Sequence, residues 1–531
     1  MKTLFTFLLA VSINTAFTQF DIVFQKNIGG SGFDGLEMIY TPDSSGYYLI
    51  GLSNSNSSFD KSENSRGGFD LWILKTDLNF NIEWQKTIGG NQEDSYTGAI
   101  VTDTAIYCLL TTFSTPSFEM NATNYGLYDF WFLKLDLDGN ILDQKTYGGT
   151  SGDQAVKLMK WSNHFLLLGT SNSPISGNKT QDSKGAGDYW LLEIDPLDLS
   201  VVTEKVIGSA NGDTFRDATI TDNQELFLMG YSLVGTSGDK TDNGYGATDV
   251  WMVKLDNTLN VVADKCFGGS NSEEPAGTLI TDGTNLYFVN SSYSGATGNK
   301  TTLQVPGFDG NSRSDIWLVK LDDDLNKVWE RSFGGSHDDY PSRIVLLEDG
   351  LLAIGSNAQS AQGTGNRTAP SYGARDGWMV FVNTDGTPIG QFTLGGSADD
   401  GVSVGYQRGD TLICLASTAS PVSGNQTTGT HGSTDAWLVK LKITDLATSN
   451  FAAKNFDLNL YPNPSNDFVV FDFSAPQDKD QLISIFSSDG KKVDEFILLA
   501  GENSSTWYPT CGSGIYYYSV GELKGKVVIE D

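Results

Sequence analysis

The stretch "DLWILKTDLNFNIEWQKTIGG", residues 70–90, decides the fold because altered copies of it recur along the chain. Close copies begin at Asp129, Asp249 and Asp315. The tryptophan of the D-x-W core occurs seven times, at successive spacings of 59 to 66 residues. The seven are Trp72, Trp131, Trp190, Trp251, Trp317, Trp378 and Trp437. Self-similarity at such a period is typical of solenoids and propellers.

Each repeat contains strand-like runs and no apolar pattern of helical period. In the second repeat these runs are residues 81–88, 96–102, 105–112 and 129–135, with turn residues between them. Four strands per repeat favour a propeller over a parallel β-helix or an α-solenoid. We therefore predict an all-β chain with a seven-bladed β-propeller over residues 19–446.

The apolarity of each run predicts its place in a blade. Runs such as "YYLIGLS" (47–53) and "DLWILK" (70–75) are almost continuously apolar, as expected for strands covered on both faces. The stretch that ends in Gly-Gly is more polar and fits the outer edge, where lysine discourages edge-to-edge pairing. Runs such as "GAIVTD" (98–103) carry small residues and fit the crowded centre.

Ring closure follows from this order of strands. The last D-x-W strand, at residues 435–440, has no Gly-Gly strand after it, whereas "FDIVFQKNIGG" (20–30) has no repeat before it. We predict that the N-terminal strand completes the seventh blade, which removes two open sheet edges.

The N-terminal residues 1–18 have the features of a cleaved secretory signal peptide. A lysine at position 2 precedes an apolar run and then a step of small residues near Ala16. The apolar run is too short to cross a bilayer, and no later segment reaches the required length, so we expect no membrane span. The expected location is therefore outside the cell or on its outer surface, reached through the periplasm.

Composition argues against one class of partner and one kind of stabilisation. The formal net charge of −31 repels phosphate backbones, so nucleic-acid binding is disfavoured. The four cysteines lie in separate apolar or strand-like contexts, which predicts buried free thiols and no disulfide framework.

After residue 446 the repeat stops, and residues 447–456 form a polar linker. The tail, residues 457–531, then contains "YPNP" (461–464), "SSDGKKV" (487–493), "GSGIYYYSV" (512–520) and a closing "KGKVVIED". The motif residues are Tyr461, Pro462, Asn463, Pro464, Gly490 and Gly514.

In these motifs the tail resembles the C-terminal sorting domain of the type IX secretion system of Bacteroidetes. The resemblance implies a small β-sandwich, recognition by the type IX secretion machinery, export across the outer membrane, and release or surface attachment. The acidic end, Glu530 and Asp531, departs from the basic end of many relatives. An Ig-like module that belongs to the functional unit is the alternative interpretation. The repeat region resembles propeller repeats of secreted proteins from the same bacteria, which implies a fold without an activity.

Two series of acidic residues recur once per repeat. One precedes the tryptophan strands, as at Asp70. The other stands four residues after each Gly-Gly step and comprises Asp34, Asp94, Asp153, Asp213, Glu273, Asp339 and Asp400. Repetition in every blade favours a structural role, with the carboxylates accepting hydrogen bonds from nearby backbone N–H groups. The alternative is coordination of Ca²⁺, the one candidate cofactor, although the chain contains no EF-hand loop.

The loops between the two middle strands carry a second repeated motif, "SGNKT" (176–180) and its variants. Glycine followed by Asn or Asp predicts a tight turn. Loops of this kind form the accessible surface on which rigid scaffolds place binding. Our candidate binding-face residues are Asn178, Lys179, Asp239, Lys240, Asn299, Lys300, Asn366 and Asn425.

Signals of catalysis are poor, so the sequence favours a protein that is not an enzyme and names no catalytic residue. His164, His337 and His431 are the only histidines and share no catalytic spacing. His337, next to two aspartates, is the best single candidate for acid–base chemistry. The leading hypothesis is a secreted or cell-surface, non-catalytic propeller that binds glycan or protein. The alternative is an extracellular glycoside hydrolase or lyase that uses carboxylates in the central channel.

Overall fold

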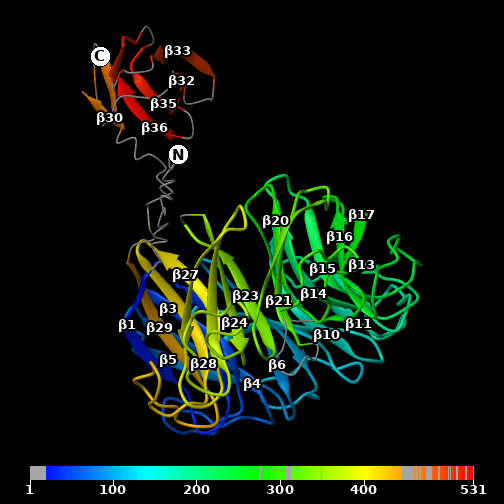
Figure 1. The fold of residues 1–531 in the computed structure, drawn as a ribbon. Helices are drawn as coiled ribbons and strands as arrows, with labels where there is room; N and C mark the ends of the chain where they lie inside the picture. Colours follow the sequence, from blue (N-terminus) through cyan, green and yellow to red (C-terminus); the bar gives the residue numbers. More distant parts are fainter. Residues whose placement is uncertain are drawn as a thin grey trace, which may run out of the picture. The chain divides into compact units, whose positions relative to one another are not determined.

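The computed structural model describes residues 19–444 except 275–276, 306–312 and 349. In the C-terminal part it describes residues 458–461, 465, 468–473, 481–487, 491–499, 502, 504–509, 512–520 and 523–529. These residues form two compact units, one ending at residue 444 and one beginning at residue 458 (Figure 1). The signal peptide and linker predictions lie outside the described residues.

The larger unit consists of seven antiparallel sheets, six of which are built from strands that follow one another in sequence. Blade 1 contains β2 (Asp34–Tyr40), β3 (Gly46–Ser53), β4 (Asp70–Asp77) and β5 (Ile82–Ile88), and blade 2 contains β6 (Asp94–Val101), β7 (Ile106–Thr112), β8 (Asp129–Leu135) and β9 (Ile141–Tyr147). Blade 3 contains β10 (Asp153–Trp161), β11 (His164–Ser171), β12 (Asp188–Ile194) and β13 (Val201–Ile207), and blade 4 contains β14 (Asp213–Ile220), β15 (Leu226–Leu233), β16 (Thr248–Leu255) and β17 (Val261–Phe267).

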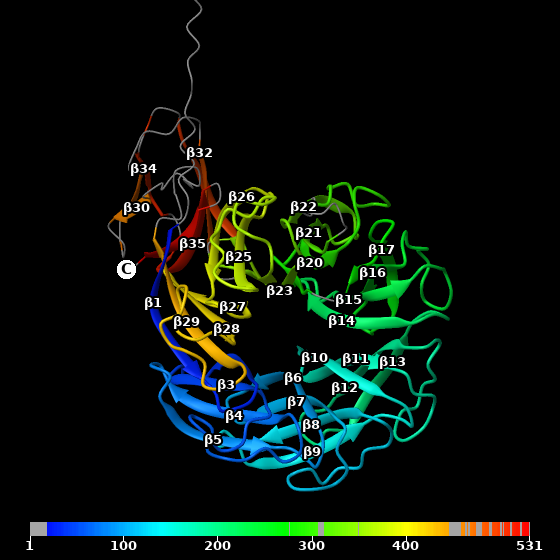
Figure 2. The same ribbon diagram turned by 60° about the horizontal axis from the view of Figure 1, so that its bottom comes forward.

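The remaining three blades keep this plan with two variations. Blade 5 divides its first strand into β18 (Glu273–Glu274) and β19 (Leu279–Thr281), followed by β20 (Leu286–Ser292), β21 (Asp315–Leu321) and β22 (Lys327–Phe333). Blade 6 contains β23 (Asp339–Leu346), β24 (Leu351–Ala358), β25 (Asp376–Asn383) and β26 (Pro388–Leu394). Blade 7 contains β27 (Asp400–Arg408), β28 (Thr411–Thr418) and β29 (Asp435–Thr444), and its fourth strand is β1 (Gln19–Ile28) from the other end of the chain. The unit is a seven-bladed β-propeller (Figure 2).

The N-terminal strand closes the ring, as the sequence predicts. β1 pairs antiparallel with β29 from Gln19 opposite Thr444 to Ile28 opposite Ala436. Gln25 of β1 also donates to the backbone oxygen of Asn425, at 2.8 Å. In blade 1 Gln85 makes the matching bond to Asp60, so the borrowed strand reproduces the contacts of a resident one.

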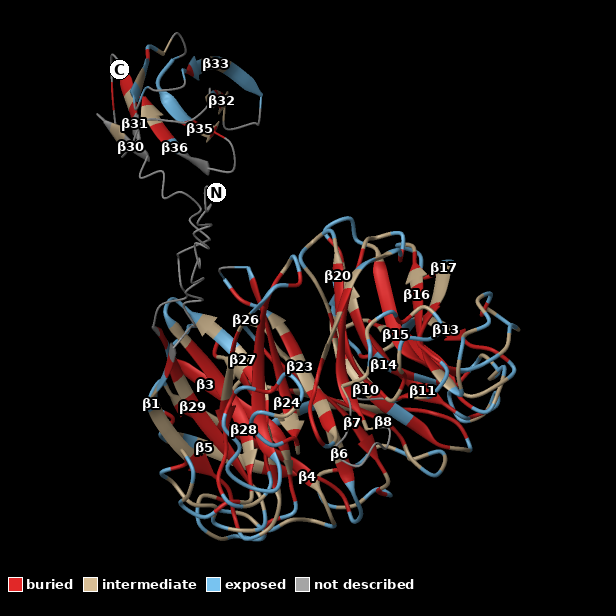
Figure 3. Ribbon diagram, in the orientation of Figure 1, coloured by how far each residue is buried: buried red, intermediate tan, exposed pale blue. Residues whose placement is uncertain are grey.

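The predicted order of strands within a blade is also confirmed. The D-x-W strand and the strand before it lie in the middle of each sheet and are buried almost throughout (Figure 3). All seven repeat tryptophans are at most 1% exposed. The first strand of each blade lies nearest the centre of the ring, and the Gly-Gly strand lies at the periphery (Figure 2).

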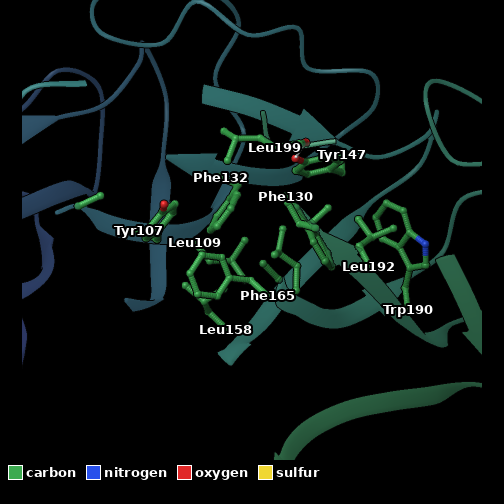
Figure 4. Packing of buried hydrophobic residues seen from close by; sticks show 14 of the residues in the cluster. Tyr107, Leu109, Phe130, Phe132, Tyr147, Leu158, Phe165, Trp190, Leu192 and Leu199 are labelled. Atoms are coloured by element: carbon green, nitrogen blue, oxygen red, sulfur yellow. Dashed lines mark hydrogen bonds between the residues drawn. The ribbon is translucent and has the colours of Figure 1, made fainter. Parts of the chain in front are cut away.

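Apolar side chains join neighbouring blades into one ring. Between blades 2 and 3, aromatic residues of β8 and β11, including Phe132 and Phe165, pack with Trp190 of β12 (Figure 4). Comparable clusters lie between other pairs of blades. Because each blade buries its faces against its neighbours, stability depends on the complete ring.

Three of the four cysteines, Cys108, Cys266 and Cys414, are buried and free, as predicted. Burial raises the pKa of the Cys266 and Cys414 thiols to about 12, which suppresses their reactivity. Cys511 lies outside the described residues.

The C-terminal unit is a small β-sandwich. One sheet contains β30 (Leu458–Tyr461), β31 (Val469–Phe473) and β34 (Ser504–Trp507), and the other contains β32 (Gln481–Ser487), β33 (Lys492–Leu498), β35 (Gly514–Val520) and β36 (Leu523–Ile529). Phe471 of the first sheet and Ile485 of the second belong to one buried core. Tyr461 ends β30 and Gly514 begins β35, whereas Pro462, Asn463, Pro464 and Gly490 lie outside the described residues.

Candidate functional site in the central channel

The carboxylates that follow the Gly-Gly steps are buried in all seven blades. Asp153 is typical: its Oδ2 accepts from the backbone N–H of Gly149 at 2.7 Å and from the Ser173 hydroxyl at 2.8 Å. Each carboxylate of the series accepts at least one hydrogen bond from its own blade or blade connection. Burial raises the pKa of Asp94 and of Asp339 to about 6, and that of Glu273 to about 7.

The aspartates that begin the D-x-W strands contact the same blade connections. Asp70 accepts from the backbone N–H of Arg66 at 2.7 Å through Oδ2, while its Oδ1 is buried without a hydrogen-bond partner. A Cβ atom at Gly89, the first glycine of the step, would lie 1.9 Å from that Oδ1. All seven blades repeat this approach, which explains why the position is glycine.

Both carboxylate series therefore accept hydrogen bonds within the blades and blade connections, which is the arrangement that a structural role requires. Among the described residues, no group of three or more His, Cys, Asp or Glu side chains is placed to hold a metal ion. The Ca²⁺ hypothesis thus gains no support from the arrangement of these carboxylates.

In four blades the asparagine side chain of the loop motif connects the blade to the strand that leads into it. Asn178 accepts from the N–H of Gly148 at 2.9 Å and donates to the carbonyl of Thr146 at 2.8 Å. Asn299, Asn366 and Asn425 make the same pair of bonds in their blades, and Asp239 accepts from Gly208. The hydrogen-bonding groups of these side chains are therefore used within the propeller.

The expectation that the lysines of this motif are exposed is wrong. Lys179, Lys240 and Lys300 are each 2% exposed. The Lys300 ammonium lies 5.9 Å from the ring centre of Trp317 and donates to the carbonyls of Ser294 and Thr302 at 2.8 and 3.1 Å. Burial lowers the pKa of Lys300. The sequence of the motif indicates a solvated turn. In the structure, however, the lysine ammonium group lies over the ring of the repeat tryptophan.

We expect Lys300→Ala to lower the free energy of unfolding by about 2–3 kcal/mol, because it empties a packed site and leaves two carbonyls without their donor. Met120 occupies the equivalent position of blade 2 and is 1% exposed. Lys300→Met is therefore the matched control and should lose clearly less. Chemical denaturation of both variants measures the difference. An unchanged denaturation midpoint for Lys300→Ala would contradict this packing role and would favour the loop face as an accessible binding surface.

None of the histidines belongs to a catalytic constellation. His164 lies 2.7 Å from Glu193, and His337 contacts the neighbouring Ser336 hydroxyl at 2.9 Å. His431 stacks on Phe59 with ring centres 4.7 Å apart, at the contact between blade 7 and blade 1. The two aspartates beside His337 face the scaffold: Asp338 accepts from Ser314, and Asp339 from Ser360.

The central channel contains a group of charged residues that sequence reasoning missed. Two adjoining cavities, of ≈ 480 and ≈ 550 Å³, lie among the inner strands and share lining residues that include Lys157, Asp217 and Arg343. Glu37 and Arg216 line the larger cavity. These charges come from blades 1, 3, 4 and 6, so only the closed ring brings them together.

Two of these residues form a braced ion pair. Lys157 of β10 lies 2.5 Å from Oδ1 of Asp217 on β14. Asp217 also accepts from the backbone N–H groups of Leu279 at 2.7 Å and Ala218 at 2.8 Å. This carboxylate therefore ties together the inner strands of three consecutive blades.

Glu37 has a different environment from Asp217. It accepts from the hydroxyl of Tyr96 and from the backbone N–H of Ala99 at 3.2 Å. Burial raises its pKa to about 7, against the opposing effect of the nearby Arg343 and Lys157. Glu37 is thus partly protonated near neutral pH.

The channel charges do not repeat from blade to blade, unlike the anchor carboxylates. The fourth residue after the anchor carboxylate is Met38, Gly98, Lys157, Asp217, Gly277, Arg343 and Val404 in successive blades. The third residue is charged only as Glu37 and Arg216. An alignment of the seven repeats would have revealed these channel residues. Positions with a structural role keep the same residue type from blade to blade, whereas the channel positions do not.

The fold and its closure define an all-β propeller protein with a separate C-terminal sandwich. Residues 459–530 match the family described as the secretion system C-terminal sorting domain. The chain carries a type IX secretion system sorting domain, so it interacts with that machinery and is exported to the cell surface or the medium. No helix able to cross a membrane occurs in the part of the chain that the structure describes.

Comparisons with other proteins add no activity. No curated protein matches the chain. Among solved structures, the Neurospora crassa Pan2 WD40 domain has a TM-score of 0.41 and 9% identity, over 78% of this chain and 90% of that one. A europium-containing methanol dehydrogenase has a TM-score of 0.41 and 10% identity, over 80% and 93%. Kuenenia stuttgartiensis hydrazine synthase has a TM-score of 0.33 and 10% identity, over 66% and 80%. These likenesses are too weak to carry an argument.

Proposed function

We propose that this protein is an exported, non-catalytic propeller that binds a glycan or protein ligand through its central channel. One observation supports the channel as the site: charged side chains from four blades line one cavity there, at positions that are uncharged in the other blades, while the carboxylates and loop motifs bond within the scaffold. In a scaffold built from equivalent units, a function needed once belongs at positions that are not equivalent.

A carboxylate-dependent hydrolase or lyase is the alternative, and it has less support. Glu37 and Asp217 line one cavity, and burial raises the pKa of Glu37 to about 7, which suits a general acid or base. However, Asp217 is already engaged by Lys157 and two backbone N–H groups, which weakens it as a base or nucleophile. Bound glycan that is released unaltered would favour the binder over the enzyme.

The test uses the mature chain, residues 19–531, on arrays of glycans and surface proteins. Gly98 lines the larger cavity, and a Cβ atom there would approach only Leu158, at 3.8 Å, so Gly98→Tyr should place a ring in the channel without a backbone clash. Gly295→Tyr is the control, because Gly295 follows β20 in a loop outside the channel and has no atom within 4 Å of an added Cβ.

We expect Gly98→Tyr to reduce binding more than tenfold and Gly295→Tyr to leave it within twofold. Equal binding by both variants and the unmodified chain would place the site outside the channel. Thermal unfolding of each variant verifies that the ring remains intact.

A further inference from the structure

The larger channel cavity contains more cations than anions, although the chain as a whole is strongly acidic. Lys157, Arg216 and Arg343 line it together with the carboxyl groups of Glu37 and Asp217. Lys157 and Asp217 neutralise each other. The two arginines remain, opposed by one carboxyl group whose pKa is about 7.

Arg216 is the most informative of these cations. It is exposed into the cavity, and its side chain has no hydrogen-bond or ion-pair partner among the described residues. With 65 acidic residues against 34 lysines and arginines, an arginine that served only the scaffold would have many carboxylates to choose from. An unpaired guanidinium in a cavity can bind a carboxylate or sulfate group through two parallel N–H donors.

Arg343 lies two blades further along the ring, in blade 6, and is half-buried. It lies near Glu37 and Tyr406, both of which line the same cavity. Two guanidinium groups from blades 4 and 6 thus face one space of ≈ 550 Å³, which is within the size range of small-ligand sites.

The rest of the wall suits a saccharide better than a peptide. Ten of the 17 lining residues have polar side chains, which include hydroxyl, amide and phenol groups such as those of Thr97, Gln154 and Tyr406. Such groups match sugar hydroxyls. Peptide recognition by side-chain anchors would instead need an apolar or aromatic pocket, and the apolar residues here are small or belong to the strand walls.

We propose that the channel binds an acidic saccharide, whose carboxylate or sulfate group is held by Arg216 and Arg343. This inference rests on the proposed channel function and gives its ligand a chemical class. The negative field of the remaining chain opposes the approach of anions, so affinity must come from short-range contacts with these two arginines.

The test measures binding of the mature chain to three matched probes by titration calorimetry: digalacturonate, sulfated digalactose and neutral digalactose. Arg216→Gln is the principal variant, because Arg216 has no hydrogen bond or ion pair with the described scaffold to lose. Arg343→Gln is the second variant. Lys442→Gln is the control, since Lys442 is an exposed cation of β29 outside the cavity.

We expect at least one acidic probe to bind ten times more tightly than the neutral probe, and each arginine variant to lose at least tenfold while Lys442→Gln stays within twofold. The two acidic probes distinguish carboxylate from sulfate. Equal binding of the neutral probe, or no change in Arg216→Gln, would overturn the anionic ligand.

Other outcomes separate this inference from the proposed function. If only neutral glycans or proteins bind, and Gly98→Tyr abolishes that binding, the channel function stands and the acidic saccharide is wrong. Binding of a polyglutamate peptide in place of every saccharide would likewise overturn the saccharide class. Absence of binding to any acidic probe rejects this inference, and binding of other ligands that resists Gly98→Tyr rejects the channel as well.

Discussion

Deletion of residues 458–531 is expected to abolish export and to leave a folded propeller in the periplasm. The sorting domain occupies 459–530, and the propeller ends at residue 444 with its own closed ring of blades. Because the deletion removes no strand of the ring, the truncated protein should retain its stability. Fractionation of cells followed by immunoblotting measures where it accumulates.

The control for this deletion is a chain in which the tail is kept and the channel is altered, Arg216→Gln. It should reach the surface or the medium like the unmodified protein, since the channel has no part in sorting. Normal amounts of the truncated chain in the medium would contradict the assignment of the tail.

Deletion of residues 19–30 is expected to cost about 5 kcal/mol or more, comparable with the whole stability of many domains. The deletion removes β1, and with it the buried Phe20 and Ile28 and every backbone hydrogen bond to β29. It leaves β29, the tryptophan strand of blade 7, as an unpaired edge, which is a template for aggregation. Size-exclusion chromatography and thermal unfolding measure both effects.

Val23→Lys is the matched control, because Val23 lies on β1 but is 55% exposed. A lysine there adds charge to an edge strand without loss of core contacts, so stability should change by less than about 0.5 kcal/mol. A monomeric deletion variant with an unchanged melting temperature would show that β1 does not close the ring.

The fold was predictable because its determinants are local and occur seven times. The apolar D-x-W strand, the more polar Gly-Gly strand and the turns between them each follow from short-range periodicity and turn chemistry. Closure was predictable for the same reason: the residues at 20–30 have the pattern of an outer strand, and the last repeat lacks one. The tail was identifiable from short motifs in a characteristic order.

The candidate site was not predictable to the same degree. The carboxylate series lies in the blade connections, and one Asp or Glu per repeat predicts a structural role for it. Lys179 and Lys300 were misplaced, because a Gly-Asn-Lys turn is usually solvated and nothing in the local sequence shows that the lysine covers Trp190 or Trp317. Burial of a long side chain depends on the space that the neighbouring strands leave.

Repetition along the chain was enough to specify seven blades and their order of strands, since each blade depends on residues close in sequence. It also indicated the closing strand, because the pattern of one repeat is divided between the two ends of the propeller. The channel required the tertiary structure. Glu37, Arg216 and Arg343 are separated by more than a hundred residues from one another, and each is an ordinary charged residue in its own strand. They share one cavity because ring closure brings the inner strands of distant blades around a common axis, and a closed ring is a property of all seven blades together.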